Sequence, residues 1–407
     1  MPVTIWGLVC YHEIMERLLE VYGLEEMYMF YNNLGKTGKR VSAIGLGCEN
    51  LDGKPYPQVR EVIDAAIDSG INIFDVFMPG REIRENIAKA IGDRRDQVMI
   101  QGHIGSTDIN QQYDISRDLK TVKKYFEEML RIFGYIDFGM MFFIDTEKDY
   151  KDVFETEFID YVLGLKEKGD IRHIGFSSHN PVTAAKVIST GVPEMMMFSI
   201  NPAFDMLPSE ESIFDHMETD MGVHLYRGLD PKRARLYRIC SAGQVGITVM
   251  KSLGGGKLIS KEHTPFARPL TVPQCIHYAL SRPSVGSVMV GAQTIEEIRS
   301  AVSYFELTDE EKDYSQIIAT MKNDFMGNCV YCGHCQPCPS DIDIAAVNKY
   351  LDIARLTPGQ VPASIRSHYN GLPHRGDECI GCKSCEERCP FGVPVVKNME
   401  EAETLFR

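Results

Sequence analysis

The chain has 407 residues, of which 44% are hydrophobic, and its formal net charge is −14. This length and apolar content predict two or three folded domains with a large core, and they argue against disorder. The acidic balance, without any cluster of lysine and arginine, argues against nucleic acid or an anionic membrane as a partner. No apolar run approaches the roughly 20 residues that span a bilayer, and the start lacks a signal-peptide pattern, so we expect a cytoplasmic protein.

Strand-like apolar runs alternate with amphipathic helical patterns from residues 34 to about 306. Residues 58–70 and 116–134 are two of these helical patterns. The expected strands cover residues 41–47, 71–76, 98–105, 136–145, 171–178, 194–201, 246–253 and 285–292. Eight strands, each followed by a helix, predict an α/β fold in which a (β/α)8 TIM barrel closes on itself.

Barrels of this type carry their reactive side chains at the carboxyl ends of the strands. These ends hold polar residues and one glycine, namely Glu49, Asp75, His103, Asp145, Ser177, Ser178, His179, Asn201, Lys251 and Gly291. Any one of them also suits a loop cap, but their agreement around the ring favours a site. His179 precedes an Asn-Pro pair, and we interpret it as part of the next helix cap. A long link covers residues 203–243. Its later half is interpreted as the returning helix, and its earlier half, with Asp205, Pro208 and His216, is interpreted as a lid over the mouth.

The chain has twelve cysteines, and their placement is uneven. Cys10, Cys48, Cys240 and Cys275 lie in apolar stretches, where a buried free thiol is expected. The other eight form two groups near the C-terminal end, each ending in Cys-Pro: Cys329, Cys332, Cys335 and Cys338, then Cys379, Cys382, Cys385 and Cys389. A disulfide framework does not explain such grouping in a reducing compartment.

The spacing within each cysteine group predicts iron–sulfur ligation. Two-residue gaps let three thiolates bind corners of one [4Fe–4S] cubane, and in two-cluster ferredoxins the fourth cysteine ligates the other cluster. We therefore expect Cys389 to join the first group's cluster and Cys338 to join the second group's. The first group has one residue fewer before its last cysteine, which leaves its cross-ligation open. Structural zinc is the alternative, although zinc needs neither the third evenly spaced cysteine nor the Cys-Pro pair.

These features divide the chain into four parts. We predict an N-terminal extension over residues 1–33, a (β/α)8 barrel over 34–307, a connecting helix over 308–328 and an iron–sulfur domain over 329–407. Residues 342–356, between the cysteine groups, have apolar positions at helical spacing, so this last part is expected to be a small helical ferredoxin-like domain.

Four motifs resemble the aldo-keto reductase superfamily. They are LGKTGKRVSAIGLG (34–47), GFSSHN (175–180), GITVMKSLGGGKL (246–258) and VMVGAQTIEEI (288–298). Together with the cysteine groups, they are similar to a branch that carries a C-terminal ferredoxin module. The resemblance implies a nicotinamide cofactor across the carboxyl-terminal mouth of the barrel. It also implies carbonyl reduction by hydride transfer, with a tyrosine acid assisted by lysine, aspartate and histidine.

The sequence departs from that family at the expected catalytic positions. Asp75 stands where the family aspartate is expected, but no tyrosine follows it at the usual distance. His103 takes the place of the lysine, and Ile144 or Asp145 that of the histidine. We interpret Asp75 and His103 as a proton-handling pair, because histidine exchanges protons near neutral pH, with Asp145 as a third proton carrier.

The cofactor remains open between FMN and NADP(H). The candidate cofactor-binding residues are Ser177, Ser178, Asn201, Lys251, Leu253, Gly254, Gly255, Gly291, Gln293 and Glu297. The glycine loop and the backbone at Gly291 suit a phosphate. Gln293 and Glu297, however, stand where an NADP-binding member would commonly place a basic residue and an adenine-contacting one.

The combination of barrel and clusters constrains the chemistry. A nicotinamide gives up two electrons as a hydride, whereas a cubane takes one at a time, so coupling them needs a flavin or a substrate that accepts single electrons. We predict an iron–sulfur oxidoreductase that acts on a small organic molecule and exchanges electrons with an external carrier such as ferredoxin. The alternatives are a NAD(P)H-dependent carbonyl reductase with structural clusters and a non-catalytic electron carrier or redox sensor.

Overall fold

The computed structural model describes residues 29–109, 112–206, 230–319, 327, 329, 331–355, 361 and 363–407. Almost all of the expected N-terminal extension and the end of the expected connecting helix therefore lie outside the described residues. Pro208 and His216 of the expected lid also lie outside them. None of the described helices is both long enough and apolar enough to span a bilayer.

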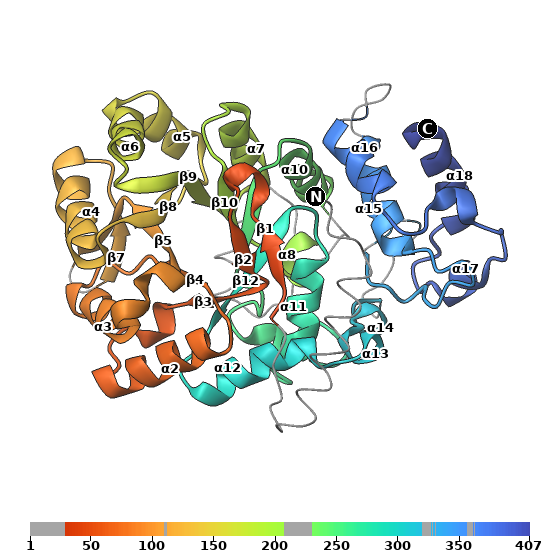
Figure 1. The fold of residues 1–407 in the computed structure, drawn as a ribbon, viewed down its shortest axis with the longest axis horizontal. Coiled ribbons are helices and arrows are strands. Elements are labelled where there is room, and N and C mark those ends of the chain that lie inside the picture. Colours follow the sequence, from red (N-terminus) through yellow and green to blue (C-terminus); the bar gives the residue numbers. More distant parts are fainter. Residues whose placement is uncertain are drawn as a thin grey trace, which may run out of the picture.

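The eight expected strands form one closed barrel, which confirms the predicted fold class (Figure 1). They are β3 (Ile44–Gly47), β4 (Ile73–Val76), β5 (Met99–Ile104), β8 (Ile136–Met141), β9 (Ile171–Ser178), β10 (Met195–Ser199), β11 (Gly246–Met250) and β12 (Val285–Gly291). Neighbouring strands pair in parallel around the ring, and β12 pairs back to β3. All the carboxyl ends of the strands therefore open on one face, the mouth of the barrel.

Helices surround the barrel, and the longer ones each bury an apolar face against it. They are α2 (Tyr56–Asp68), α3 (Arg81–Ile91), α4 (Leu119–Phe133), α5 (Glu147–Phe154), α6 (Glu157–Lys168), α7 (Pro181–Ser189), α8 (Pro202–Asp205), α10 (Pro231–Ala242), α11 (Val272–Leu280) and α12 (Ile295–Val302). Sequence signals define several starts: the Asn180 side chain caps α7 ahead of Pro181, and Thr271 and Gln274 form a capping box on α11. Asn180, and not His179, therefore provides the side-chain cap that we expected before α7.

The interior of the barrel is filled by side chains, as in other barrels of this class. A cluster separate from the main core holds Leu34, Val41, Ile73, Phe138, Met140, Met195, Met197 and Met289. Glycines on the strands make room for these large side chains, since a Cβ atom on Gly175 would lie 2.4 Å from the sulfur of Met140.

Two hairpins flank the barrel. β1 (Tyr31–Asn33) and β2 (Arg40–Ser42) join through a short 3-10 turn (Gly35–Thr37) whose Lys36 amide bonds Gln244, just before β11. This hairpin thus closes the end opposite the mouth. β6 (Ser106–Ile109) and β7 (Gln112–Ile115) follow β5 at the mouth, where the Ser106 hydroxyl bonds the carbonyl of Phe77.

The C-terminal part is helical and packs beside the barrel (Figure 1). The expected connecting helix is broken in the described residues into α13 (Asp309–Lys312) and α14 (Ser315–Ile318), because Asp313 between them has extended backbone. The remaining helices are α15 (Ile344–Ala354), α16 (Ala363–Asn370), α17 (Ser384–Arg388) and α18 (Val395–Phe406). α15 packs on α18 within this domain, and α15 and α16 contact α10 of the barrel.

The turn between β1 and β2 offers a matched pair of glycines. Gly35 and Gly38 both have positive φ, but a Cβ atom on Gly35 would meet the Gly246 amide at 2.3 Å, whereas one on Gly38 meets nothing within 4 Å. We expect Gly38→Ala to lower the free energy of unfolding by about 1–2 kcal/mol, the strain of a left-handed residue. Gly35→Ala should cost about 1–3 kcal/mol more through overpacking. Urea unfolding followed by circular dichroism measures both, and equal losses would contradict close packing of this turn against β11.

Candidate functional site

A buried polar network crosses the barrel interior just below the mouth. The Asp75 carboxylate, at the end of β4, accepts hydrogen bonds from Gln101 Nε2 at 2.6 Å and from His103 Nε2 at 2.8 Å, both on β5. Thr248 on β11 donates to Gln101 Oε1 at 2.9 Å. Asp75 is 4% exposed and His103 is 2% exposed. The structure therefore brings together the two residues expected to form the proton-handling pair.

The hydrogen bond to Asp75 fixes the orientation of His103. An ionised carboxylate can only accept, so His103 Nε2 carries the proton that is donated to Asp75. His103 Nδ1 is buried and has no hydrogen-bond partner among the described residues. The rings of Phe77 and Phe142 flank the imidazole, with centroids 6.1 and 5.3 Å away. His103 Nδ1 is thus a proton acceptor held in an aromatic setting.

The residue beside His103 at the end of β8 differs from the expected one. We expected Ile144 or Asp145 at the position of the family histidine, but β8 ends at Met141 and Phe142 lies against His103. Phe143 then adopts a positive φ of 56°, which turns the chain out of the strand. Asp145 consequently belongs to a different cluster from Asp75 and His103.

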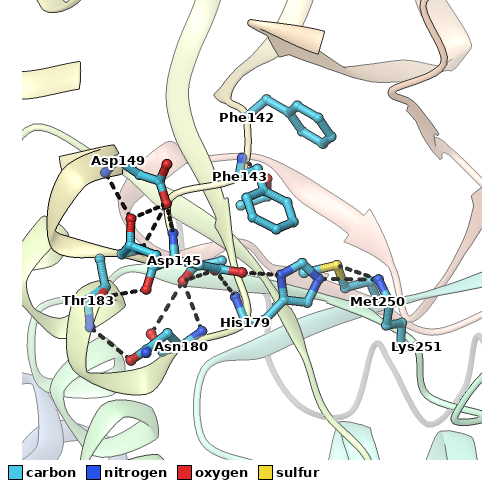
Figure 2. Close-up of polar contacts among 12 residues, drawn as sticks. Phe142, Phe143, Asp145, Asp149, His179, Asn180, Thr183, Met250 and Lys251 are labelled. Carbon is cyan, nitrogen blue, oxygen red and sulfur yellow. Dashed lines mark hydrogen bonds and ion pairs between the residues drawn. The ribbon is translucent and has the colours of Figure 1, made fainter. Parts of the chain in front are cut away.

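Asp145 forms a relay with His179 and Lys251 (Figure 2). Asp145 Oδ2 lies 2.8 Å from His179 Nδ1, and His179 Nε2 lies 3.2 Å from Lys251 Nζ. Asp145 Oδ1 also accepts the His179 amide at 2.6 Å and the Ser178 hydroxyl at 2.9 Å. Because Nδ1–H of His179 donates to the Asp145 carboxylate, Nε2 is the acceptor, and the Lys251 ammonium donates to it.

Burial and charge shift the titration of the relay. Burial raises the pKa of Asp145. The electrostatic effect of His179 and the hydrogen bonds that His179 and Ser178 donate to the Asp145 carboxylate outweigh burial, so the pKa is lowered. Burial lowers the pKa of His179 despite Asp145, with Lys251 adding to the decrease. The pKa of Lys251 is also lowered by burial, although the nearby carboxylates of Glu49, Asp145 and Asp75 oppose this shift. Burial therefore favours the neutral forms of both His179 and Lys251.

Glu49 extends this charged group toward β3. Burial raises the pKa of its carboxyl, and the negative charge of Asp75 raises it further, while Lys251 lowers it. Glu49, Asp75 and Lys251 thus influence one another across the mouth. The two clusters described above share one electrostatic environment.

Three of the expected cofactor residues bind the mouth's own loops. Ser177 Oγ accepts the Phe143 amide at 2.8 Å, and Ser178 donates to Asp145. The Asn201 side chain caps α8 and donates to the Lys251 carbonyl at 2.8 Å. These hydrogen bonds shape the site, and a role for the three residues in holding a cofactor stays a prediction.

The expected phosphate-binding loop is a series of tight turns after Lys251 and Leu253. Gly254 and Gly255 have φ of 59° and 65°, which favours glycine. The Gly254 amide already bonds the Lys251 carbonyl at 2.9 Å, and the Gly256 amide bonds that of Leu253 at 3.0 Å. The loop therefore has fewer amides to offer a phosphate than its glycine content implied.

The last strand leads to a helix start that carries its own carboxylate. Gly291 ends β12, and the Gln293 amide donates to Glu297 Oε2 at 2.6 Å, in the first turn of α12. The Gln58 side chain binds the carbonyl of Gln293 at 2.9 Å. A carboxylate at a helix N-terminus competes with a phosphate for the same amides.

Sequence reasoning missed residues that lie inside strands or on distant helices. Gln101 and Thr248 precede the strand ends, and Arg233 comes from α10, where Nη2 donates to the His179 carbonyl at 3.3 Å. A glutamine within the apolar strand of residues 98–105 was the one available signal. The prediction that Asp205 belongs to a lid over the mouth is wrong, because this residue is fully buried in α8.

The eight clustered cysteines line two neighbouring recesses of the C-terminal domain. One recess is lined by Cys329, Cys332, Cys335 and Cys389. The other is lined by Cys338, Cys379, Cys382 and Cys385. Ile344 and Val395 line both recesses and thus separate them. Within the described part of the chain, no three or more His, Cys, Asp or Glu side chains are grouped so as to hold a metal ion.

The barrel agrees with comparisons to known proteins. The model of the aldo/keto reductase family matches residues 43–269. The chain therefore belongs to the aldo/keto reductase family and is an oxidoreductase of the aldo-keto reductase type. It is similar to an uncharacterized oxidoreductase, YqkF, of Bacillus subtilis (strain 168), with 25% identity over 308 residues, 68% of this chain and 92% of that protein.

Solved structures share the fold at lower sequence identity. The holo form of aldo-keto reductase AKR11C1 from Bacillus halodurans superposes with a TM-score of 0.55 and 21% identity, covering 73% of this chain and 97% of that one. A putative aldo-keto reductase from Pseudomonas aeruginosa gives a TM-score of 0.51 and 17% identity, covering 68% and 95%. These likenesses support the barrel architecture.

The relay makes a prediction about His179 that can be measured directly. Lys251→Met removes a cation that lowers the pKa of His179, so we expect that pKa to rise. Asp145→Asn removes the carboxylate that raises it, so we expect the pKa to fall further. The pKa is measured by NMR titration of protein labelled with ¹⁵N in its histidine side chains. Lys186→Met, which removes an exposed lysine paired with Glu147, is the control and should leave His179 unchanged. Shifts of the same sign in the Lys251 and Asp145 variants would contradict the relay.

Proposed function

We propose that this oxidoreductase is an iron–sulfur enzyme. Its barrel reduces or oxidises a small organic substrate at the mouth, and its C-terminal domain is a ferredoxin-like module with two [4Fe–4S] clusters. The clusters exchange single electrons with an external carrier such as ferredoxin. The observation that carries this proposal is the sorting of eight cysteines into two recesses of four.

The membership of each recess supports cubane ligation. Each recess takes three cysteines from one sequence group and its fourth from the other group, the pairing that two-cluster ferredoxins use. Thiolates are the ligands of such clusters, so the donor set fits. Because Ile344 and Val395 line both recesses, two clusters held there would be neighbours, which suits electron transfer in single steps.

The mouth supplies protons in two places, as a redox reaction of an organic molecule requires. Reduction by two single electrons consumes two protons, and oxidation releases them. His103 can accept or donate one at Nδ1, and Lys251 holds one beside His179. A flavin, or a substrate that accepts single electrons, completes the coupling to the clusters.

A carbonyl reductase that uses a nicotinamide is the second candidate. Membership of the aldo/keto reductase family favours it, and Tyr113 of β7 meets Phe77 edge to face at 5.4 Å, which brings a tyrosine to the rim. The rings directly beside His103, however, belong to phenylalanines and have no proton to give. The carboxylate of Glu297 at the start of α12 opposes a 2′-phosphate there, so NAD(H) suits this rim better than NADP(H).

Anaerobic purification followed by iron and sulfide analysis, visible spectroscopy and identification of released small molecules tests the proposal. We expect about eight irons per chain, four for each cubane, with a bound flavin or no hydride carrier. Eight irons with a bound nicotinamide would favour the reductase with structural clusters. Zinc in place of iron would overturn the proposal.

The pairing of the cysteines is tested by combining substitutions. Cys389→Ser should remove about half of the iron, because one cubane of two loses a ligand. Adding Cys332→Ser should remove little further iron, since Cys332 and Cys389 line the same recess. Adding Cys382→Ser instead should remove the remaining iron. Iron content of the single and double variants measures this, with the buried Cys275→Ala as the control. The opposite pattern would place Cys389 with the second group.

A further inference from the structure

Lys251 lies against a histidine that is itself held by a carboxylate. Lys251 Nζ is 3.2 Å from His179 Nε2, and His179 Nδ1 is 2.8 Å from Asp145 Oδ2 (Figure 2). Asp145 also accepts the His179 amide at 2.6 Å, so it holds both the ring and the backbone of this histidine. An amine within hydrogen-bond reach of a base that a third group orients is the arrangement of an activated nucleophile.

The backbone at the end of β11 takes an uncommon conformation to place this lysine. β11 ends at Met250, and Lys251 follows with a positive φ of 58°, which is rare for a residue other than glycine. The Asn201 side chain and the Gly254 amide both donate to the Lys251 carbonyl, at 2.8 and 2.9 Å, and hold it there. The Lys251 side chain is half-buried, so a small molecule can still reach it. Such strain is typical of functional positions.

Charged groups on neighbouring elements face this lysine and its histidine. The carboxylates that act on Lys251 are those of Glu49, Asp145 and Asp75, and Arg233 of α10 acts on His179. Burial lowers the pKa of Lys251 more than these carboxylates raise it, so its amine forms at a lower pH than that of an exposed lysine. The same carboxylates repel an anionic carbonyl compound, so the electrostatics favour an uncharged one.

We propose that Lys251 is a nucleophile that forms a reversible imine with a small, uncharged aldehyde or ketone, and that His179 is the base for this step. The Phe143 ring, whose centroid lies 5.3 Å from that of His179, provides an apolar surface for the organic part of the molecule. This inference goes beyond the proposed function, and it requires no iron–sulfur cluster.

The atoms of this step balance without an oxidant or a reductant. The Lys251 ammonium gives one proton to His179 Nε2, and the amine nitrogen then bonds to the carbonyl carbon as the carbonyl double bond opens. His179 returns its proton to the oxygen, which leaves as water with a second proton from the nitrogen, and a protonated imine remains. Asp145 stabilises the imidazolium formed on the way. The positive nitrogen of the imine draws electrons from the neighbouring carbon, which eases the loss of a proton there.

Reductive trapping on the purified full chain tests the nucleophile. The probe is benzaldehyde with cyanoborohydride, which reduces an imine to a stable secondary amine, and mass spectrometry of peptides measures the labelling of each lysine. We expect Lys251 to be labelled about tenfold or more faster than Lys186, an exposed lysine paired with Glu147. With 4-carboxybenzaldehyde, which adds one negative charge to the same probe, most of this preference should be lost.

A variant of the histidine tests the base. His179→Gln keeps the lysine and removes the proton acceptor, so labelling of Lys251 should slow about tenfold or more while that of Lys186 is unchanged. Circular dichroism checks that the variant is folded, and Lys186→Met is the control that should leave Lys251 labelling at the wild-type rate.

Each part of the inference has an outcome that overturns it. Equal labelling of Lys251 and Lys186 in the wild-type protein would overturn the nucleophile, and this comparison needs no variant. Wild-type labelling of Lys251 in the folded His179→Gln protein would overturn the role of the base. An undiminished preference with the anionic probe would overturn the assigned class of carbonyl compound. Iron content does not enter these measurements, so their failure would leave the proposed function standing.

Discussion

One buried carboxylate ties the barrel mouth to the elements around it. Asp205 is fully buried in α8, where Tyr278 donates to it at 2.8 Å, Tyr237 donates to its other oxygen and Arg233 lies 3.5 Å away. Burial raises its pKa, and the two arginines nearby and the tyrosine hydroxyls oppose this. A buried charge is tolerated only with such partners, and removing one from a pair of this kind costs about 3–5 kcal/mol. The three partners come from α10 and α11, so α8 is fixed to both helices.

The consequences reach both halves of the protein. Arg233 also binds the His179 carbonyl, and Asn201 at the start of α8 binds that of Lys251, so two of the three relay residues are held by α8 and its partner Arg233. Toward the C-terminal domain, the Tyr278 ring lies 5.1 Å from that of Tyr314. The Tyr314 hydroxyl accepts a hydrogen bond from Arg282. α10, which carries Arg233, also contacts α15 and α16 (Figure 1). The geometry of the mouth and the packing of the C-terminal domain on the barrel thus both depend on the hydrogen bonds around Asp205.

Sequence patterns predicted the barrel because its strands are set by local periodicity. Each of the eight apolar runs became a strand, and Asp75 and His103 met because parallel strands end on one face. The relay could not be predicted in the same way. Asp145, His179 and Lys251 were all placed at strand ends, but their pairing depends on loop conformations that strand periodicity does not encode, such as the positive φ of Phe143 and of Lys251. Gln101 lies in the middle of a strand, and a search limited to strand ends does not find a polar residue there.

The cysteine recesses are the opposite case, in which spacing alone carried most of the information. Ligand spacing is local within each group, so a few residues define three of the four cysteines in each recess. Only the exchange of the fourth cysteine needs the chain to fold back, and the packing of α15 on α18 accompanies this. The division suits the proposed chemistry, in which electrons would pass between two clusters held by the cysteines and protons would be delivered to one substrate at the mouth. The C-terminal domain therefore needs correct spacing, whereas the mouth needs the long-range network built on Asp205.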